Sequence, residues 1–182
     1  MTSVRYVLLL RGINVGGKNK VVMAELKSAL ELLGFSNVSS YINSGNLFFE
    51  SQERHQKIVE KITELFKITY EFELLFIVIS AEAFQQEYLN LPAWWQSEYA
   101  RKDVLFYTDL VDKEQFKLAI EAMSLGEEII YFGELAVYWA KYSETAYKQT
   151  AYAKNLIKTP FYKQVTIRNG NTFEKIKQLL LQ

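Results

Sequence analysis

The sequence predicts an α+β protein of two ferredoxin-like units, each ordered β-α-β-β-α-β, with an additional C-terminal helix. The same order of strand and helix patterns occurs twice, in residues 1–80 and in residues 103–182. Residues 81–102 read as a connecting helix and linker. The two copies share no close residue identity, so one larger mixed sheet with helices on one face is the alternative. With 49% hydrophobic and 23% charged residues, the chain is not intrinsically disordered.

The first repeat begins with a continuous apolar run over residues 4–10, which predicts a buried strand. The next helix is expected over residues 23–33, because its apolar residues recur at i, i+3, i+4 and i+7 and Gly34 follows as a stop signal. The remaining elements are two short strands joined at Asn43–Asn46, a helix and a strand, expected over residues 38–42, 47–50, 53–68 and 72–79.

A helix at residues 81–89 leads into the second repeat. Asp112 and Gln115 have the spacing of a helix N-cap and its partner. Asn171, with Glu174 three residues later, predicts the start of the C-terminal helix. The strands and helices of this repeat are expected in the order given above, over residues 104–107, 113–123, 128–132, 135–140, 145–157 and 165–168.

Composition excludes several classes of protein. The chain has no Cys and one His, so a disulfide framework, a thiolate zinc site and a multi-His metal site within one chain are excluded. No stretch is long enough for a signal peptide or a membrane span, and cytoplasmic residence is the default expectation. No cofactor and no membrane partner are expected, and the sequence assigns no oligomeric state.

The formal net charge of +0 argues against coating of nucleic acid by a generally basic protein. The charge is distributed unevenly, however. Residues 1–49 hold five cations and two acids, residues 135–182 hold eight cations and two acids, and the acids are in excess between them. A local anion site therefore remains compatible with the neutral total.

The segment Arg11–Lys20 is the most unusual in the chain, with three glycines, three cations and no acid. From Gly12 it reads G-x-x-x-x-G-K-N, one residue short of a P-loop. Asn19 has no hydroxyl for Mg²⁺, and the predicted sheet is not parallel, so a Walker-type ATPase is excluded. Glycine amides with Arg11, Lys18 and Lys20 are typical of an anion nest. The alternative is a glycine connection whose lysines are only solvated.

In a ferredoxin-like unit the first and second strands end at the same sheet edge. The Arg11–Lys20 loop and the Asn43–Asn46 hairpin should therefore face each other, and the second repeat has no equivalent loop. Turn formation alone is the alternative role for the hairpin asparagines. The polar side chains expected around a bound anion are those of Asn14, Asn43, Ser44 and Asn46.

A further polar cluster, Thr166–Thr172, joins a strand to a helix start, and helix N-termini bind anions. Arg168, Asn169 and Asn171 are therefore candidate ligand-binding residues. A simple turn capped by Asn171 is the alternative that the residues favour.

Two other functions stay open. Aromatic and cationic residues alternate between residues 138 and 163, as in single-stranded nucleic-acid sites, although an amphipathic helix face explains them better. An RNA- or DNA-binding module using this basic third is thus possible but not favoured. An enzyme of unknown reaction is the third hypothesis, and we lean against it. Ser44 is not in a nucleophile elbow, no Asp cluster suggests a Mg²⁺ site, and no general base is evident.

Four strings carry a resemblance to one bacterial family: residues 10–21, residues 23–26, Tyr41–Asn46 and Thr166–Thr172. Over essentially the whole chain, the sequence resembles the uncharacterised bacterial family known as domain of unknown function 1697. The resemblance implies an α+β fold with two ferredoxin-like parts, and it implies no activity. The family often has Trp between the last two asparagines, where this chain has Gly170.

Overall fold

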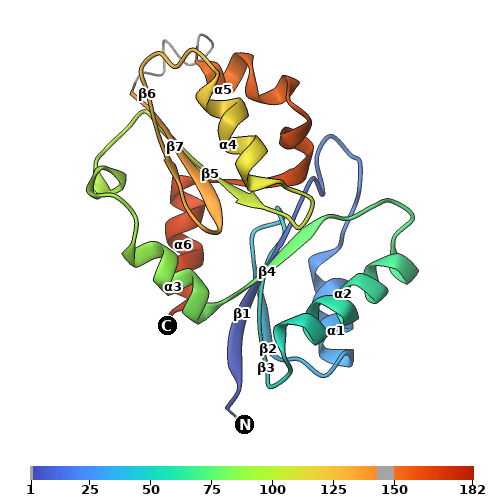
Figure 1. Cartoon of the computed structure of the whole chain (residues 1–182). Coiled ribbons are helices and arrows are strands. Elements are labelled where there is room, and N and C mark those ends of the chain that lie inside the picture. Colours follow the sequence, from blue (N-terminus) through green and yellow to red (C-terminus); the bar gives the residue numbers. More distant parts are fainter. Residues whose placement is uncertain (1, 143–149) are drawn as a thin grey trace. The chain divides into compact units, whose positions relative to one another are not determined.

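Two four-stranded antiparallel sheets form the framework of the chain, in strand orders β2-β3-β1-β4 and β6-β7-β5-β8. The computed structural model describes residues 2–142 and 150–182. The chain divides into two compact units, the first made of Met1–Gln85 with Ile176–Gln182 and the second of Gln86–Lys175. Figure 1 shows the elements in chain order. Each unit has the β-α-β-β-α-β order of a ferredoxin-like fold, as the sequence predicts.

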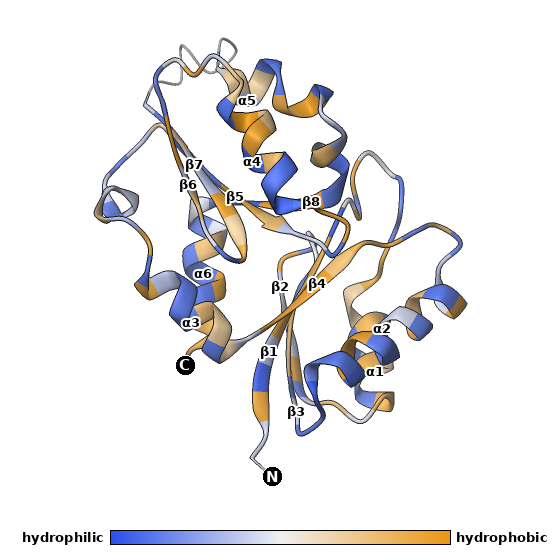
Figure 2. Ribbon diagram, in the orientation of Figure 1, coloured by the Kyte–Doolittle hydropathy of each residue, from blue (hydrophilic) through white to orange (hydrophobic). Residues whose placement is uncertain are grey.

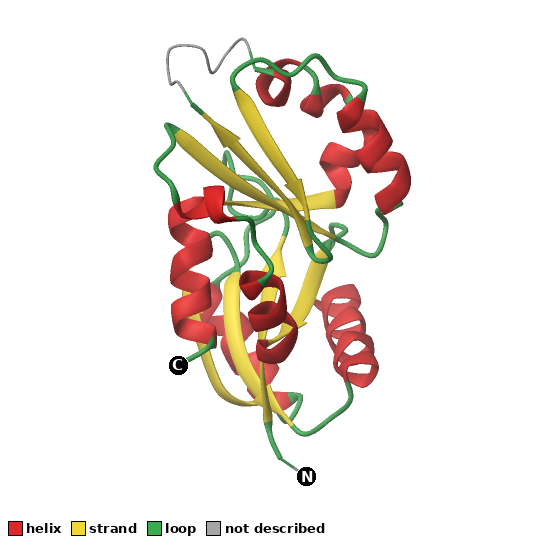
Figure 3. Cartoon of the chain, turned by 60° about the vertical axis from the view of Figure 1, so that its left-hand side comes forward, coloured by secondary structure: helices red, strands yellow, loops and turns green. Residues whose placement is uncertain are grey.

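The first unit follows the predicted pattern closely, and its elements are distinguished as helices and strands in Figure 3. The predicted strand over residues 72–79 begins later, because Phe72 and Leu74 reach the core from a bend ahead of the strand. The elements are β1 (Val4–Leu10), α1 (Met23–Leu32), β2 (Ser36–Tyr41), β3 (Asn46–Ser51), α2 (His55–Thr69) and β4 (Phe76–Ser80).

The core of the first unit lies between its sheet and helices α1 and α2. Alternate residues of β1 face these helices, and Leu8 packs among Leu26 and Leu30 of α1 and Ile58 and Ile62 of α2. Val7 and Leu9, on the other face of β1, are also buried, so residues 6–10 form a continuous buried apolar run. Figure 2 shows β4 as strongly hydrophobic as well.

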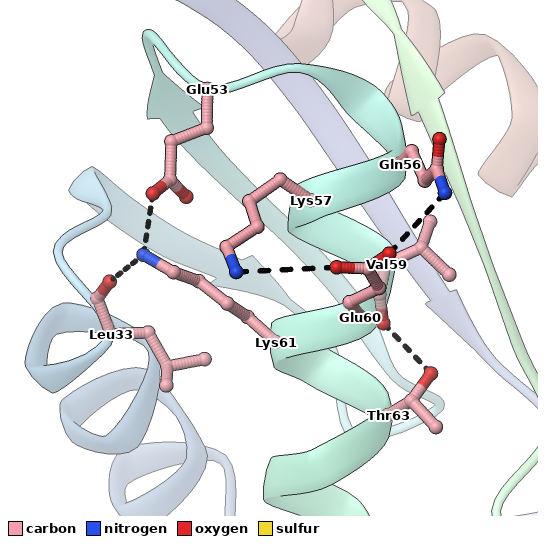
Figure 4. A network of polar contacts seen from close by, with 8 residues as sticks. All are labelled: Leu33, Glu53, Gln56, Lys57, Val59, Glu60, Lys61 and Thr63. Atoms are coloured by element: carbon pink, nitrogen blue, oxygen red, sulfur yellow. Dashed lines mark hydrogen bonds and ion pairs between the residues drawn. The ribbon is translucent and has the colours of Figure 1, made fainter.

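Lys61 of α2 joins this helix to the end of α1 by a hydrogen bond (Figure 4). Lys61 of α2 donates from Nζ to the Leu33 carbonyl oxygen at 3.0 Å, and lies 2.6 Å from Oε1 of Glu53. The cation thereby satisfies a carbonyl at the end of α1, where four carbonyls have no partner within the helix. This contact fixes the end of α1 opposite the start of α2.

The second unit has the same order of strands and helices, with 3₁₀ segments (η) added. Helix α3 (Ala81–Leu89) runs from the first unit into the second. The other elements are η1 (Ala93–Gln96), β5 (Arg101–Tyr107), α4 (Lys113–Glu121), β6 (Glu128–Phe132), β7 (Ala136–Lys141), α5 (Ala151–Lys154), η3 (Leu156–Lys158), η4 (Pro160–Gln164), β8 (Val165–Asn169) and α6 (Gly170–Leu180).

The prediction of one helix over residues 145–157 is wrong in the length of the helix. Thr150 is extended and caps α5, its side chain accepting a hydrogen bond from the Ala153 backbone N–H, so the helix begins only at Ala151. Residues 145–149 of that prediction lie outside the described residues. The N-cap expected at Asn171 is also wrong. Asn169 Oδ1 accepts from the Thr172 N–H at 2.8 Å, which places the cap two residues earlier.

Each face of the second sheet has its own packing. Phe116 and Ile120 of α4 pack against Leu105, Val137 and other apolar residues of one face. Aromatic rings cover the opposite face. They form edge-to-face and stacked pairs with centroids 5.2–6.1 Å apart, made by Trp95, Phe106, Tyr138 and Phe173. Such pairs add to the stabilisation that comes from burial alone.

A buried ion pair lies at one end of this sheet. Lys141 is fully buried, and its Nζ bonds to the carboxylate of Asp103. The same ammonium group lies 3.3 Å from the centroid of the Tyr152 ring. Burial lowers the pKa of Lys141, while the Asp103 carboxylate acts in the opposite direction. The charges are thus paired within the core, as buried charges must be.

Glu87 of α3 holds the turn between β6 and β7. Its carboxylate accepts from the backbone N–H groups of Glu134 and Leu135 at 2.9 and 2.7 Å, and from the hydroxyl of Tyr138 at 3.1 Å. Burial, followed by the charge of Glu87, raises the pKa of Tyr138 well above its usual value. These three hydrogen bonds to one buried carboxylate hold the β6–β7 turn in one conformation.

We expect Gly133→Ala to destabilise the protein, because an added Cβ would lie 2.5 Å from Glu87 Oε2 and 2.9 Å from the Tyr138 ring. The expected loss is about 1–3 kcal/mol, the usual cost of overpacking. Chemical denaturation measures it. Gly126→Ala is the matched control, since its Cβ meets no atom within 4 Å. Equal stability of the two variants would contradict this account of the turn.

We expect Lys141→Met to destabilise the protein by about 3–5 kcal/mol, because it leaves the Asp103 carboxylate buried without its cation. The double variant Lys141→Met/Asp103→Leu removes both charges and should recover a large part of this loss. Urea unfolding of the wild type and both variants gives the comparison. A double variant no more stable than Lys141→Met would contradict this account, because an unpaired buried carboxylate would then not be the cause of the loss.

Candidate functional site

The Arg11–Lys20 loop is a small, well-defined hairpin in the first unit. Its tip is the turn Val15-Gly16-Gly17-Lys18, closed by a hydrogen bond of 3.0 Å from the Lys18 N–H to the Val15 carbonyl oxygen. Gly16 and Gly17 have φ of 59° and 74°, the paired positive values that a tight hairpin turn of this kind requires. The glycines therefore serve a turn, and the loop does not have the P-loop form.

The side chain of Asn14 holds this hairpin in place. Its Oδ1 accepts from the Val21 N–H at 2.9 Å, and its Nδ2 donates to the Val21 carbonyl at 3.0 Å. Nδ2 also donates to the carbonyl of Asn43 at 2.9 Å. These contacts confirm that the loop and the β2–β3 hairpin face each other. They also show that the Asn14 amide is engaged within the protein.

The β2–β3 connection, residues 42–45, lies close to the end of β1. The Leu10 N–H donates to the Gly45 carbonyl at 2.9 Å, and a Cβ on Gly45 would lie 2.7 Å from that of Leu10. Only glycine fits here. Asn46 is buried, and its Nδ2 donates to the Tyr41 carbonyl and to Ser44 Oγ. Asn46 therefore has the turn-forming role that was the alternative for it, and Asn43 is exposed.

The charged side chains of the loop are all positive. Lys18 and Lys20 are exposed and have no acidic partner among the described residues, and no acid occurs in the sequence before Glu25. Arg11 is half-buried, and its backbone N–H donates to the Leu75 carbonyl. In the described part of the chain, no group accepts a hydrogen bond from the backbone amides of Gly16 and Gly17. Two ammonium groups and two amides are thus available to an anion.

The predicted residues of the last motif belong to the second unit. Arg168 is 6% exposed, and its Nη1 donates to the Thr166 hydroxyl and to the Ile167 carbonyl, both at 2.9 Å. Burial lowers the pKa of Arg168 to about 10. Asn169 caps α6, and Asn171 is exposed in its first turn. Asn169 and Asn171 also line a pocket of about 260 Å³ with Arg101 and Asp103.

In the aromatic and basic stretch toward the C-terminus, several of the aromatic residues are buried. Tyr138, Trp139 and Lys141 are fully buried in the second unit, so they offer no platform for stacked bases. Tyr147 and Lys148 lie outside the described residues. The amphipathic explanation fits the described part of this stretch better than a nucleic-acid surface does.

The only His in the sequence, His55, is exposed and bonds through Nε2 to the Val78 carbonyl at 2.8 Å. Across residues 2–142 and 150–182, no three His, Cys, Asp or Glu side chains gather as a metal site would require. Among the described helices, none combines the length and the apolar character needed to cross a bilayer.

Sequence reasoning missed two residues of this edge of the first sheet. Val15 at the tip of the hairpin and Ile42 in the neighbouring connection are 67% and 50% exposed. Ile42 also has φ of 51°, which is a genuine outlier for a β-branched residue. Periodicity gives no signal for either one, because both lie outside strands and helices.

Comparison with known proteins gives a family and a close structural relative. The solved structure of the conserved bacterial protein SP0830 from Streptococcus pneumoniae is 51% identical in sequence and superposes with a TM-score of 0.95, over 98% of this chain and 99% of that one. No curated protein matches the chain. A family profile described as "Protein of unknown function (DUF1697)" matches residues 3–138. The resemblance noted in the sequence is therefore confirmed, and the chain belongs to the DUF1697 family.

Proposed function

We propose that this protein binds a small anionic or phosphorylated ligand at the Arg11–Lys20 loop. The observation that carries the proposal is the fixed hairpin, which presents Lys18, Lys20 and the amides of Gly16 and Gly17 without an acidic neighbour in the first 24 residues. Phosphate and carboxylate groups are held by such combinations of cations and oriented N–H groups. We expect the protein to bind this ligand in the cytoplasm.

Pre-organisation supports this function over a merely solvated glycine loop. Asn14 makes three hydrogen bonds, and Asn19 Nδ2 donates to the Gly12 carbonyl, so both flanks of the tip are restrained. A restrained loop loses little conformational entropy when a ligand binds. The tip amides are therefore already held in one arrangement before an anion arrives.

We expect Lys18→Ala/Lys20→Ala to weaken the binding of inorganic phosphate at least tenfold, about 1.4 kcal/mol, because two cations are lost while the amides remain. Calorimetric titration at low salt measures this affinity. Binding to the wild type should also weaken as salt is raised, since both lysines are exposed to screening.

The matched control is Lys27→Ala/Lys67→Ala, which removes the same charge from helices α1 and α2 of the same unit. It should retain wild-type affinity. An equal loss in both double variants would mean that net charge alone attracts the anion. No binding of phosphate, sulfate or a carboxylate to the wild type would refute the proposal.

We expect Asn14→Ala to lower both stability and anion affinity although it changes no charge. Loss of its three hydrogen bonds should cost about 2 kcal/mol. Urea unfolding and phosphate titration check the two effects. Asn37→Ala is the control, because Asn37 has a similar φ of 49° and no side-chain hydrogen bond in the described part of the chain. It should leave the anion affinity unchanged, and an Asn14→Ala protein with wild-type affinity would contradict pre-organisation.

A further inference from the structure

Ile42 is held in a conformation that costs energy for isoleucine, and the turn itself does not need a β-branched residue at this position. Its φ is 51°, in the left-handed region, where a β-branched side chain is strained. A four-residue connection is better served there by Asn or Gly, which adopt this conformation more easily. The strain does not serve burial either, because the side chain is 50% exposed.

A second exposed aliphatic residue lies on the neighbouring loop. Val15 is 67% exposed at the tip of the hairpin. Val15 follows Asn14 and Ile42 precedes Asn43, and these two asparagines are joined by the 2.9 Å hydrogen bond described above. The two aliphatic residues are therefore each one residue from the contact that unites the loops. Lys18 is bonded through its backbone N–H to Val15 itself.

From this arrangement we propose that the ligand is a phosphate ester whose body offers an apolar ring face, such as a nucleoside monophosphate. The phosphate binds Lys18, Lys20 and the tip amides, and the body lies against Ile42 and Val15. The exposed Asn43 side chain supplies a polar contact beside the apolar ones. The inference rests on the proposed function and adds the class of ligand to it.

The size of the apolar area favours a small molecule over a protein. The apolar area of two aliphatic side chains is enough to cover one ring of a ligand. A stable protein interface buries far more, about 800 Å² on each partner. The positive charge of the loop selects an anionic group on the same molecule. Ile42 then confers affinity on the ester beyond that of phosphate itself, and its strain is offset only in the complex.

The test compares inorganic phosphate, adenosine 5′-monophosphate and adenosine by calorimetric titration of the full chain at low salt. The wild type should bind the monophosphate about tenfold more tightly than phosphate. In Ile42→Asn this advantage should be lost, with phosphate affinity unchanged. The melting temperature should rise by about 2–4 °C as the strain is relieved. Val15→Ser should reduce the same advantage without raising the melting temperature.

Ile68→Asn is the control, since Ile68 is a 75% exposed isoleucine of α2 in the same unit. It should retain the advantage of the ester. Equal affinity of the wild type for phosphate and monophosphate would overturn this inference and leave the anion site standing. Equal weakening of both ligands by Ile42→Asn would also overturn it, because Ile42 would then only shape the loop. If neither anion binds, the inference and the proposed function both fail.

Discussion

After β1 the chain has no neighbouring strand to provide hydrogen-bond partners for its backbone N–H and carbonyl groups. The side-chain amide of Asn14 provides such partners. It pairs with both backbone groups of Val21, much as a residue on an adjacent strand would, and it reaches the Asn43 carbonyl as well. Buried and half-buried backbone groups without partners are costly. Without this one side chain, the loop would lose its hydrogen bonds to Val21 and its direct hydrogen bond to the β2–β3 connection.

The two units use the same topology but stabilise it in different ways. The first has an apolar core under α1 and α2, and its polar contacts gather at the loops. The second places charged groups inside, with Glu87 at the β6–β7 turn and Lys141 paired with Asp103. The proposed anion site thus draws on loops of the first unit, whereas many buried polar groups of the second maintain its fold.

The sequence predicts the fold well because both sheets follow from hydrophobic runs of recognisable period. It also predicts that the two loops of the first unit meet, since ferredoxin-like topology places the ends of β1 and β2 at one edge. The sequence does not predict features that depend on tertiary contacts. The restraint of Asn14 by Val21, the strain of Ile42 and the burial of Arg168 depend on contacts that no local pattern encodes. Thr150 likewise begins α5 later than the periodicity indicates.

The aromatic packing of the second unit has a consequence for optical measurements. All three tryptophans, Trp94, Trp95 and Trp139, belong to that unit, and two of them are fully buried. Indole fluorescence therefore reports the environment of the second unit, while the first unit contributes only tyrosine emission. Nine of the twelve tyrosines also belong to the second unit, so tyrosine emission does not report the first unit separately. A tryptophan introduced near the hairpin would supply the missing optical probe for the first half.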